Sequence, residues 1–343
     1  MTQARRPMRT VVYVSNADSG DISVLRMDAH TGALTPLRSA TVGGASGPLA
    51  VSPDRRFLYV ARRSEPTAVL AFAIDGTSGE LAPLGQAALP ASMAYLSIDR
   101  SGRHVLSASY GGHQLAVSPV AANGVPVPAR QVLPTEPNAH AVLADPSNRF
   151  VLATSLGGDL VMQQRFDATN GQLTPNTPAA VRVRKGAGPR HLVFHPSGRF
   201  VYLLNELDAS IDVFAFDTEQ GLLAPLQTIT SLPAGMSGAP WAADIHVTPD
   251  GRFLYSSERR SSTLAAFRID AASGLLALIG HVPTETQPRG FNIDPRGRFL
   301  LAVGQASHRL SRYAIDAASG ALSKVDDCAV GQNPHWIEII DLP

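Results

Sequence analysis

Short apolar runs separated by turn residues recur along the chain at a nearly constant spacing. Five of these runs follow a turn that starts with Pro and ends with Arg-Phe, as in Pro196-Ser-Gly-Arg-Phe-Val-Tyr202, and a weaker copy runs from Arg100 to His104. The equivalents of this Phe are Phe57, His104, Phe150, Phe200, Phe253 and Phe299, and residues 11–14 resemble the run of a seventh copy. A repeat of about 49 residues in a chain of 343 gives seven units.

A second motif, an Asp followed by Gly-x-Leu, comes after most copies of the first. Its glycines are Gly32, Gly79, Gly171, Gly221, Gly274 and Gly320. Each unit reads as four short strands, which in the fourth copy cover residues 191–194, 200–205, 211–216 and 223–230. No stretch sustains the 3.6-residue period of a helix. The pattern predicts an all-β fold, a seven-bladed β-propeller with four antiparallel strands per blade.

The two ends of the chain fit the closure of a ring. The final segment, residues 335–340, has the pattern of an innermost strand, whereas the N-terminus begins with the pattern of a second strand. We therefore expect the last blade to be closed by a C-terminal inner strand joining the N-terminal strands. No linker separates the units, so residues 1–343 are expected to form a single propeller domain.

Composition narrows the class of protein. Lys and Arg number 29 and Asp and Glu 28, a net charge of +1 that argues against a nucleic-acid-binding surface. The single cysteine, Cys328, excludes an internal disulfide framework. Residues 1–10 lack the apolar stretch of a secretory signal, and no apolar run is long enough to span a membrane. We expect a cytoplasmic protein, a monomer or weak homodimer, that binds neither nucleic acid nor membrane.

The repeat also identifies candidate site residues, because equivalent positions near the channel differ where packing positions agree. We call the Phe of the first motif, or His104 in its place, the landmark residue of its repeat. Six residues after the landmark residues lie Arg63, Tyr110, Leu156, Glu206, Arg259 and Gln305. Six residues before the turn lie Gly47, Ala94, His140, Arg190, Ala243 and Arg289. Each of these two sets of equivalent positions forms a column around the ring. Up-and-down connectivity of the strands places both columns on one face of the ring. Close to them in sequence lie His191, Asn205, Asp244, His246 and His335.

The two columns contain four arginines, one histidine and one carboxylate, which predicts a pocket for a small anion. Plainer roles are open for each residue: His140 as an ordinary strand histidine, Glu206 as a solvated turn residue, and Arg190 as its structural ion-pair partner. No Gly-x-Ser-x-Gly elbow is present, which counts against a serine hydrolase. No clustered ligand set indicates a metal, although distant blades could assemble one.

Long segments at channel-facing positions resemble a known family. They are residues 186–196, 205–207, 241–246, 283–292, 304–308 and 329–332. Across the whole chain the sequence resembles the bacterial 6-phosphogluconolactonases of the seven-bladed lactonase family, a fold shared with fungal carboxymuconate cyclases. The resemblance implies a cofactor-free enzyme that opens 6-phospho-D-glucono-1,5-lactone to 6-phosphogluconate in the pentose phosphate pathway.

The resemblance also implies four functional residues, His140, Arg190, Glu206 and Arg259, all of which lie in the two columns. Glu258 departs from the family pattern and is placed to tether Arg259. Either His140 or Glu206 is expected to activate water, with His140 preferred unless the arginines lower its pKa. Arg190 and Arg259 are expected to polarise the lactone carbonyl. The predicted substrate-binding residues are His191, Arg289, Gln305, Tyr110 and Asp244, with His191 and Arg289 on the phosphate.

Two other readings remain open. A lactonase for another sugar lactone, or a carboxymuconate cyclase-like enzyme, would use the same arginines. A non-enzymatic propeller that binds a protein partner is the third reading, but this chain has only two Trp and 6% aromatic residues and lacks the Trp-Asp dipeptide common in such scaffolds.

Overall fold

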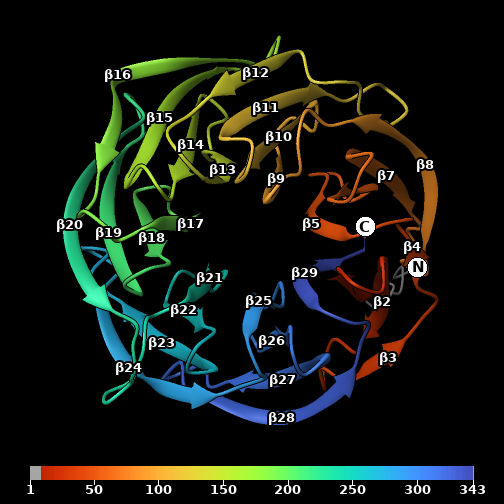
Figure 1. Cartoon of the computed structure of the whole chain (residues 1–343). Coiled ribbons are helices and arrows are strands. Elements are labelled where there is room, and N and C mark those ends of the chain that lie inside the picture. Colours follow the sequence, from red (N-terminus) through yellow and green to blue (C-terminus); the bar gives the residue numbers. More distant parts are fainter. Residues whose placement is uncertain (1–8, 343) are drawn as a thin grey trace, which may run out of the picture.

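The computed structural model describes residues 9–342 as a ring of seven antiparallel sheets around a central channel (Figure 1). The expected absence of a secretory signal concerns mainly residues 1–8, which lie outside the described residues. Within residues 9–342 no helix has the length and apolar character needed to cross a membrane. The predicted all-β propeller with seven blades is confirmed.

Each blade has four strands, and the innermost one lines the channel. The innermost strands are β5 (Ser46–Val51), β9 (Tyr95–Ile98), β13 (Ala139–Ala144), β17 (Pro189–Phe194), β21 (Ala242–Val247), β25 (Pro288–Ile293) and β29 (Pro334–Asp341). The second strands are β6 (Phe57–Arg62), β10 (His104–Ser109), β14 (Phe150–Ser155), β18 (Phe200–Asn205), β22 (Phe253–Glu258), β26 (Phe299–Gly304) and β1 (Thr10–Asn16).

The two outer positions of each blade complete the ring. The third strands are β7 (Ala68–Ile74), β11 (Gln114–Pro119), β15 (Leu160–Asp167), β19 (Ser210–Asp217), β23 (Thr263–Ile269), β27 (Arg309–Ile315) and β2 (Asp21–Met27). The outermost strands are β8 (Leu81–Ala88), β12 (Gln131–Pro134), β16 (Gln172–Arg182), β20 (Leu222–Thr230), β24 (Leu276–Pro283), β28 (Leu322–Ala329), and the short pair β3 (Leu34–Pro36) and β4 (Ala40–Thr41).

The last blade joins the two ends of the chain as expected. Its strand order is β29, β1, β2, β3, so one C-terminal strand is paired with the N-terminal strands. Val12 is opposite Ile339 and Val14 is opposite Ile337 in this pairing. The hydroxyl of Thr10 also donates to Oδ1 of Asp341 at 2.6 Å. This closure leaves the ring without a free inner edge.

The two repeat motifs pack against one another across neighbouring blades. A Cβ added to Gly274 would lie 2.5 Å from the ring of Phe200, and one added to Gly320 would lie 2.3 Å from Phe253. Both glycines also have positive φ angles, of 73° and 77°. The glycine of one blade therefore provides the space that the landmark ring of the preceding blade fills. His104, the divergent landmark, occupies the same position against Gly171.

Irregular pairing of the inner strands determines where the candidate site residues point. In β17, Pro189 is opposite Asn205 and His191 is opposite Leu204, so Arg190 is an extra residue. Bulges of the same kind occur in β5, β13, β21, β25 and β29 at the start of each strand. A bulge interrupts the alternation of faces and re-aims a side chain. Here it coincides with the column that contains His140, Arg190 and Arg289.

Candidate active site

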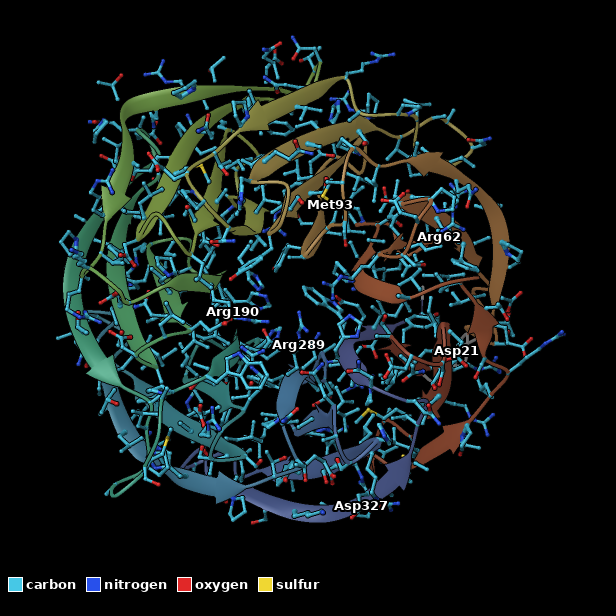
Figure 2. All side chains as sticks on the ribbon, viewed as in Figure 1. Asp21, Arg62, Met93, Arg190, Arg289 and Asp327 are labelled. Carbon is cyan, nitrogen blue, oxygen red and sulfur yellow. The ribbon has the colours of Figure 1, made fainter. Side chains whose placement is uncertain are left out.

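Arginine side chains from different blades point into the central opening of the ring. Figure 2 shows Arg190 and Arg289 extending toward it from neighbouring parts of the ring. Arg190 comes from the bulge of β17 and Arg289 from the bulge of β25. Glu206 and Arg259 follow β18 and β22 directly, in the turns on the same side of the ring. The structure thus brings the two predicted columns together at one mouth of the channel.

Glu206 is the centre of this mouth. Its Oε2 accepts a hydrogen bond from Nε of Arg190 at 2.8 Å and forms an ion pair with Nη2 of Arg259 at 3.0 Å. Both arginine side chains are almost fully buried, with 2% and 4% of their surface exposed. The two guanidinium groups lower the pKa of Glu206 although burial opposes this shift. Glu206 is therefore ionised at neutral pH.

The backbone of β21 and a stacked indole fix the two guanidinium groups. Nη1 of Arg190 donates to the carbonyl of Ala243. Nε and Nη2 of Arg259 donate to the carbonyls of Trp241 and Ala242 at 3.1 and 3.0 Å, and its guanidinium lies 3.9 Å from the centre of the Trp241 ring. Burial and the charge of Arg190 lower the pKa of Arg259 to about 9, so it stays cationic at neutral pH.

Glu258 has a different role from the one expected. Its Oε1 accepts from the backbone N–H of Trp241 at 2.6 Å, and its Oε2 accepts from the hydroxyl of Ser261 at 2.6 Å. Among the residues that the structure describes, the ion-pair partner of Arg259 is Glu206 and not Glu258. The prediction that Glu258 tethers Arg259 directly is wrong, because its two oxygens are used to order the loop that carries Trp241.

His140 lies beside this cluster and is 4% exposed. Its ring is 5.1 Å from that of His191 and 6.0 Å from that of Tyr110, which is 41% exposed at the rim. Nδ1 of His140 is buried and has no hydrogen-bond partner within residues 9–342. Burial, Arg190, His191, Arg289 and Arg259 together hold its pKa well below 6.5. The arginines therefore do lower the pKa of His140, so its ring is neutral.

Thr154 links the His140 strand to the next blade, a contact that sequence reasoning missed. Its Oγ1 accepts from the N–H of Ala141 at 2.9 Å inside the bulge of β13. The same hydroxyl donates to the carbonyl of Arg190 at 2.8 Å. This bridge fixes His140 and Arg190 relative to each other. No sequence signal marks it, because threonine is a common strand residue.

The remaining predicted binding residues are distributed over two levels of the channel. Arg289 is at the mouth, and its pKa is lowered well below the usual value by burial and by Arg190, Arg259 and Arg63. Gln305 lies in a turn of the same face and donates to Oδ1 of Asn333 at 2.7 Å. His191 and Asp244 lie deeper, joined by a hydrogen bond of 2.8 Å from Nδ1 to Oδ1.

The protonation state of His191 determines whether its second ring nitrogen, Nε2, can donate a hydrogen bond to a phosphate. Asp244 is ionised, since its histidine partners lower its pKa, and it therefore only accepts hydrogen bonds. Burial lowers the pKa of His191 to about 4, so at neutral pH the neutral ring has its proton on Nδ1. Nε2 is then an acceptor without a hydrogen to donate. The contact between His191 and a phosphate stays a prediction.

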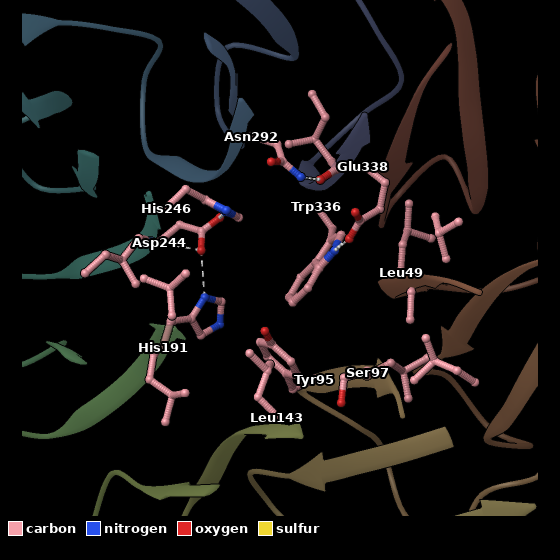
Figure 3. A pocket seen from close by; sticks show the side chains of 18 of the residues that line it. Leu49, Tyr95, Ser97, Leu143, His191, Asp244, His246, Asn292, Trp336 and Glu338 are labelled. Carbon is pink, nitrogen blue, oxygen red and sulfur yellow. Dashed lines mark hydrogen bonds and ion pairs between the residues drawn. The ribbon is translucent and has the colours of Figure 1, made fainter. Parts of the chain in front are cut away.

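Three aromatic rings form a floor below the mouth. Tyr95, His191 and Trp336 meet edge to face at ring distances of 5.0 to 5.7 Å. These three residues line a cavity of about 420 Å³, seen in Figure 3. Asp244 bonds there to His246 at 3.3 Å, and the indole N–H of Trp336 donates to Glu338 at 2.9 Å. Within residues 9–342, the lining of this cavity includes Arg100, Asp244 and Glu338 but none of Arg190, Glu206, Arg259 and Arg289.

Within residues 9–342, no group of three His, Cys, Asp or Glu side chains is arranged to hold a metal ion. Glu206 is instead paired with Arg190 and Arg259, and Asp244 with His191 and His246. The arrangement at the mouth offers a carboxylate, a neutral imidazole and several guanidinium N–H groups. Such a set can bind an anion, activate water and stabilise negative charge on oxygen.

Comparison with known proteins identifies the family. The model of the family described as "Lactonase, 7-bladed beta-propeller" matches residues 10–339. The chain belongs to this lactonase family. The match covers all seven blades, including the one closed by β29.

Curated relatives and a solved structure match this chain almost end to end. The chain is 43% identical to a 6-phosphogluconolactonase of Pectobacterium carotovorum, covering 98% of this chain and 100% of the relative. It is 40% identical to a 6-phosphogluconolactonase of Serratia proteamaculans, covering 97% and 99%. The periplasmic gluconolactonase PpgL of Pseudomonas aeruginosa superposes with a TM-score of 0.91 at 31% identity, over 98% and 100% of the two chains.

Proposed function

We propose that this protein hydrolyses 6-phospho-D-glucono-1,5-lactone to 6-phosphogluconate. The observation that carries the proposal is the buried cluster in which Glu206 lies between Arg190 and Arg259, beside the neutral His140. The names of the full-length relatives supply the substrate class. The reaction places the enzyme in the pentose phosphate pathway, and a cytoplasmic location and a monomeric or weakly dimeric state belong to the same proposal.

The free hydrogens of the two arginines provide a site for the carbonyl oxygen. Arg190 uses Nε and Nη1 for Glu206 and Ala243, and Arg259 uses Nε and Nη2 for Trp241, Ala242 and Glu206. Nη2 of Arg190 and Nη1 of Arg259 are left to donate to the substrate. Fixed donors at a developing oxyanion typically contribute about 10²–10³-fold to the rate.

His140 acts as the general base. Water attacks the lactone carbonyl carbon while the imidazole takes its proton, and the tetrahedral oxyanion is held by Arg190 and Arg259. The bond to the ring oxygen then breaks, and this oxygen takes the proton from His140. The new carboxylic acid loses its own proton to solvent. Glu206 orients the two arginines through Oε2.

Substrate binding improves His140 as a base. In the free enzyme its pKa is lowered by burial and by Arg190, Arg289 and Arg259. A phosphate dianion entering the mouth offsets the charge of these arginines, which moves the pKa of His140 back toward neutrality. A base is most effective when its pKa is close to the working pH. Glu206, held by two arginines, remains a weak base.

Separate His140→Ala and Glu206→Gln variants test the assignment. We expect kcat/KM for lactone hydrolysis, corrected for spontaneous opening, to fall at least about 100-fold in each. If both variants keep nearly full kcat/KM, the assignment is wrong.

A second candidate is hydrolysis of an unphosphorylated sugar lactone, favoured by the similarity to the gluconolactonase PpgL. The ratio of kcat/KM for 6-phosphogluconolactone and for gluconolactone separates the two. We expect the phosphorylated substrate to be preferred by at least tenfold, and equal rates would favour the second candidate.

A further inference from the structure

The arginines at the channel mouth form two groups, one with a carboxylate counter-ion and one without such a partner among residues 9–342. Arg190 and Arg259 share the carboxylate of Glu206 as counter-ion. Across the described part of the chain, neither Arg63 nor Arg289 has a carboxylate within ion-pair distance. Each of these two arginines contributes to lowering the pKa of a neighbour, Arg63 acting on Arg289 and Arg289 on His335. Positive charge therefore accumulates without compensation on one side of the mouth.

His335 lies on this uncompensated side of the mouth. It occupies the bulge of β29, the position equivalent to Arg190 and Arg289 in their strands, and it also follows a proline. It is 3% exposed, and both of its buried ring nitrogens have no hydrogen-bond partner among the residues that the structure describes. A buried polar group without a partner costs about 1–3 kcal/mol, so its presence calls for an explanation.

Gly47 leaves room for the side chain of Arg63 beside the inner strand β5. A Cβ added to Gly47, in the bulge of β5, would lie 2.8 Å from Cγ of Arg63. The side chain of Arg63 thus packs against Gly47, and among residues 9–342 its buried Nε has no hydrogen-bond partner. The strands β25, β29 and β5 are neighbours in the ring, so Arg289, His335 and Arg63 come from three consecutive blades (Figure 1).

The geometry points to a phosphate subsite formed by Arg63, Arg289 and His335, which holds the phosphate end of the substrate while the lactone end lies at Glu206. This inference rests on the proposed function for the identity of the substrate. Two guanidinium groups and an imidazole match the oxygens of a phosphate monoester dianion, which supplies the counter-charge that the protein lacks here. His335 replaces His191 as the histidine of this subsite.

Binding should be coupled to protonation of His335. Burial and the charges of Arg289, Arg63 and Arg190 hold its pKa well below 6.5 in the free protein. A bound dianion reverses the sign of the local field and favours the imidazolium, which can then donate from both ring nitrogens. We therefore expect phosphate to bind with uptake of protons at pH 7.

Inorganic phosphate is the first probe, because its binding does not depend on any catalytic activity. We expect Arg63→Met and His335→Asn to weaken phosphate binding at least tenfold by isothermal titration calorimetry. The matched control is Arg62→Met: Arg62 is the preceding residue, and its Nε donates to the carbonyl of Pro66 in an exposed contact. Titrations in two buffers of different ionisation enthalpy should show proton uptake that is smaller in His335→Asn, because only the contribution of His140 then remains.

The second readout is substrate preference. We expect the ratio of kcat/KM for phosphorylated over unphosphorylated gluconolactone to fall at least tenfold in Arg63→Met and to stay unchanged in Arg62→Met. Methionine keeps the packing of the stem on Gly47, so Arg63→Met carries the test if His335→Asn does not fold. Unchanged phosphate affinity in Arg63→Met would overturn the subsite. Phosphate binding through these residues without lactonase activity would instead refute the proposed function and leave the subsite standing.

Discussion

Asp244 and His191 lie on neighbouring blades, and a hydrogen bond of 2.8 Å joins Oδ1 of the first to Nδ1 of the second. The same carboxylate accepts from Nε2 of His246 at 3.3 Å and from the backbone N–H of Phe291 at 3.2 Å. One side chain of β21 thus binds partners from β17, β21 and β25. Asp244 fixes the ring of His191 in the floor of the mouth and connects three blades around the channel.

Asp244→Asn should destabilise the fold strongly. The substitution removes a buried charge that two histidines face, and loss of one partner of a buried pair typically costs about 3–5 kcal/mol. Urea denaturation followed by fluorescence would measure the free energy of unfolding. The control is Glu219→Gln, whose carboxylate forms an exposed ion pair with Arg149 at 3.3 Å and should contribute less than about 1 kcal/mol. Equal effects of the two substitutions would contradict the structural role of Asp244.

Glu338→Gln should change how stability depends on pH. Burial raises the pKa of Glu338 to about 7 in the folded protein, against an unfolded value of 4.5. Its contribution to stability is therefore complete below pH 4.5 and is lost as the pH rises to 7, because ionisation then occurs in a buried place. Glutamine cannot ionise and still offers an oxygen to the indole N–H of Trp336.

The measurement is the free energy of unfolding of both proteins between pH 5 and 8. Relative to pH 5, the wild type should lose about 2 kcal/mol more than Glu338→Gln by pH 8. His246 and Asp244 face the same cavity and interact with Glu338, so the difference between the two profiles includes the effect of Glu338 on His246. Parallel pH profiles would show that Glu338 titrates as an ordinary surface carboxylate.

Trp241→Leu should lower activity through Arg259. The indole ring lies 3.9 Å from the guanidinium, and such a contact is worth about 0.5–2 kcal/mol. We expect kcat for lactone hydrolysis to fall about tenfold with a smaller change in KM, because Arg259 acts on the oxyanion. Trp241→Phe keeps an aromatic face and should recover most of the activity. A loss of the same size in both variants would argue against stacking as the cause.

Gly290→Ala should be poorly tolerated. A Cβ at this position would lie 2.6 Å from the carbonyl oxygen of His335 and 3.0 Å from its carbonyl carbon. Backbone atoms cannot move aside as a flexible side chain can, so we expect a cost of about 1–3 kcal/mol. We also expect weaker phosphate binding, because His335 would be displaced.

Gly280→Ala is the matched control for that substitution. Gly280 lies in the outer strand β24, and no atom is within 4 Å of the added Cβ. Alanine there should leave the stability of the fold unchanged or raise it by about 0.4–1 kcal/mol, because it reduces the conformational entropy of the unfolded chain. Melting temperatures of the two variants provide the comparison, and similar values would contradict the close approach of β25 and β29.

Much of the architecture could be predicted from the sequence because every blade makes the same local contacts, so the residues that make them recur in each repeat. The Arg-Phe turn and the Gly-x-Leu turn recur since each landmark ring packs on the glycine of the next blade. The strands predicted at 200–205 and 223–230 lie within one residue of β18 and β20. Departures from the repeat then exposed the columns that contain His140, Arg190, Glu206 and Arg259.

The sequence alone therefore determined the number of blades, the closure of the ring and the face on which the candidate site lies. Only the tertiary structure decided which arginines share Glu206 and that Glu258 orders Trp241 instead of holding Arg259. It also decided that, in the described part of the chain, Arg63 and Arg289 have no carboxylate within ion-pair distance. The reason is physical. Periodicity records contacts that every blade makes, whereas ion pairing and protonation depend on single side chains from different blades meeting within a few ångströms.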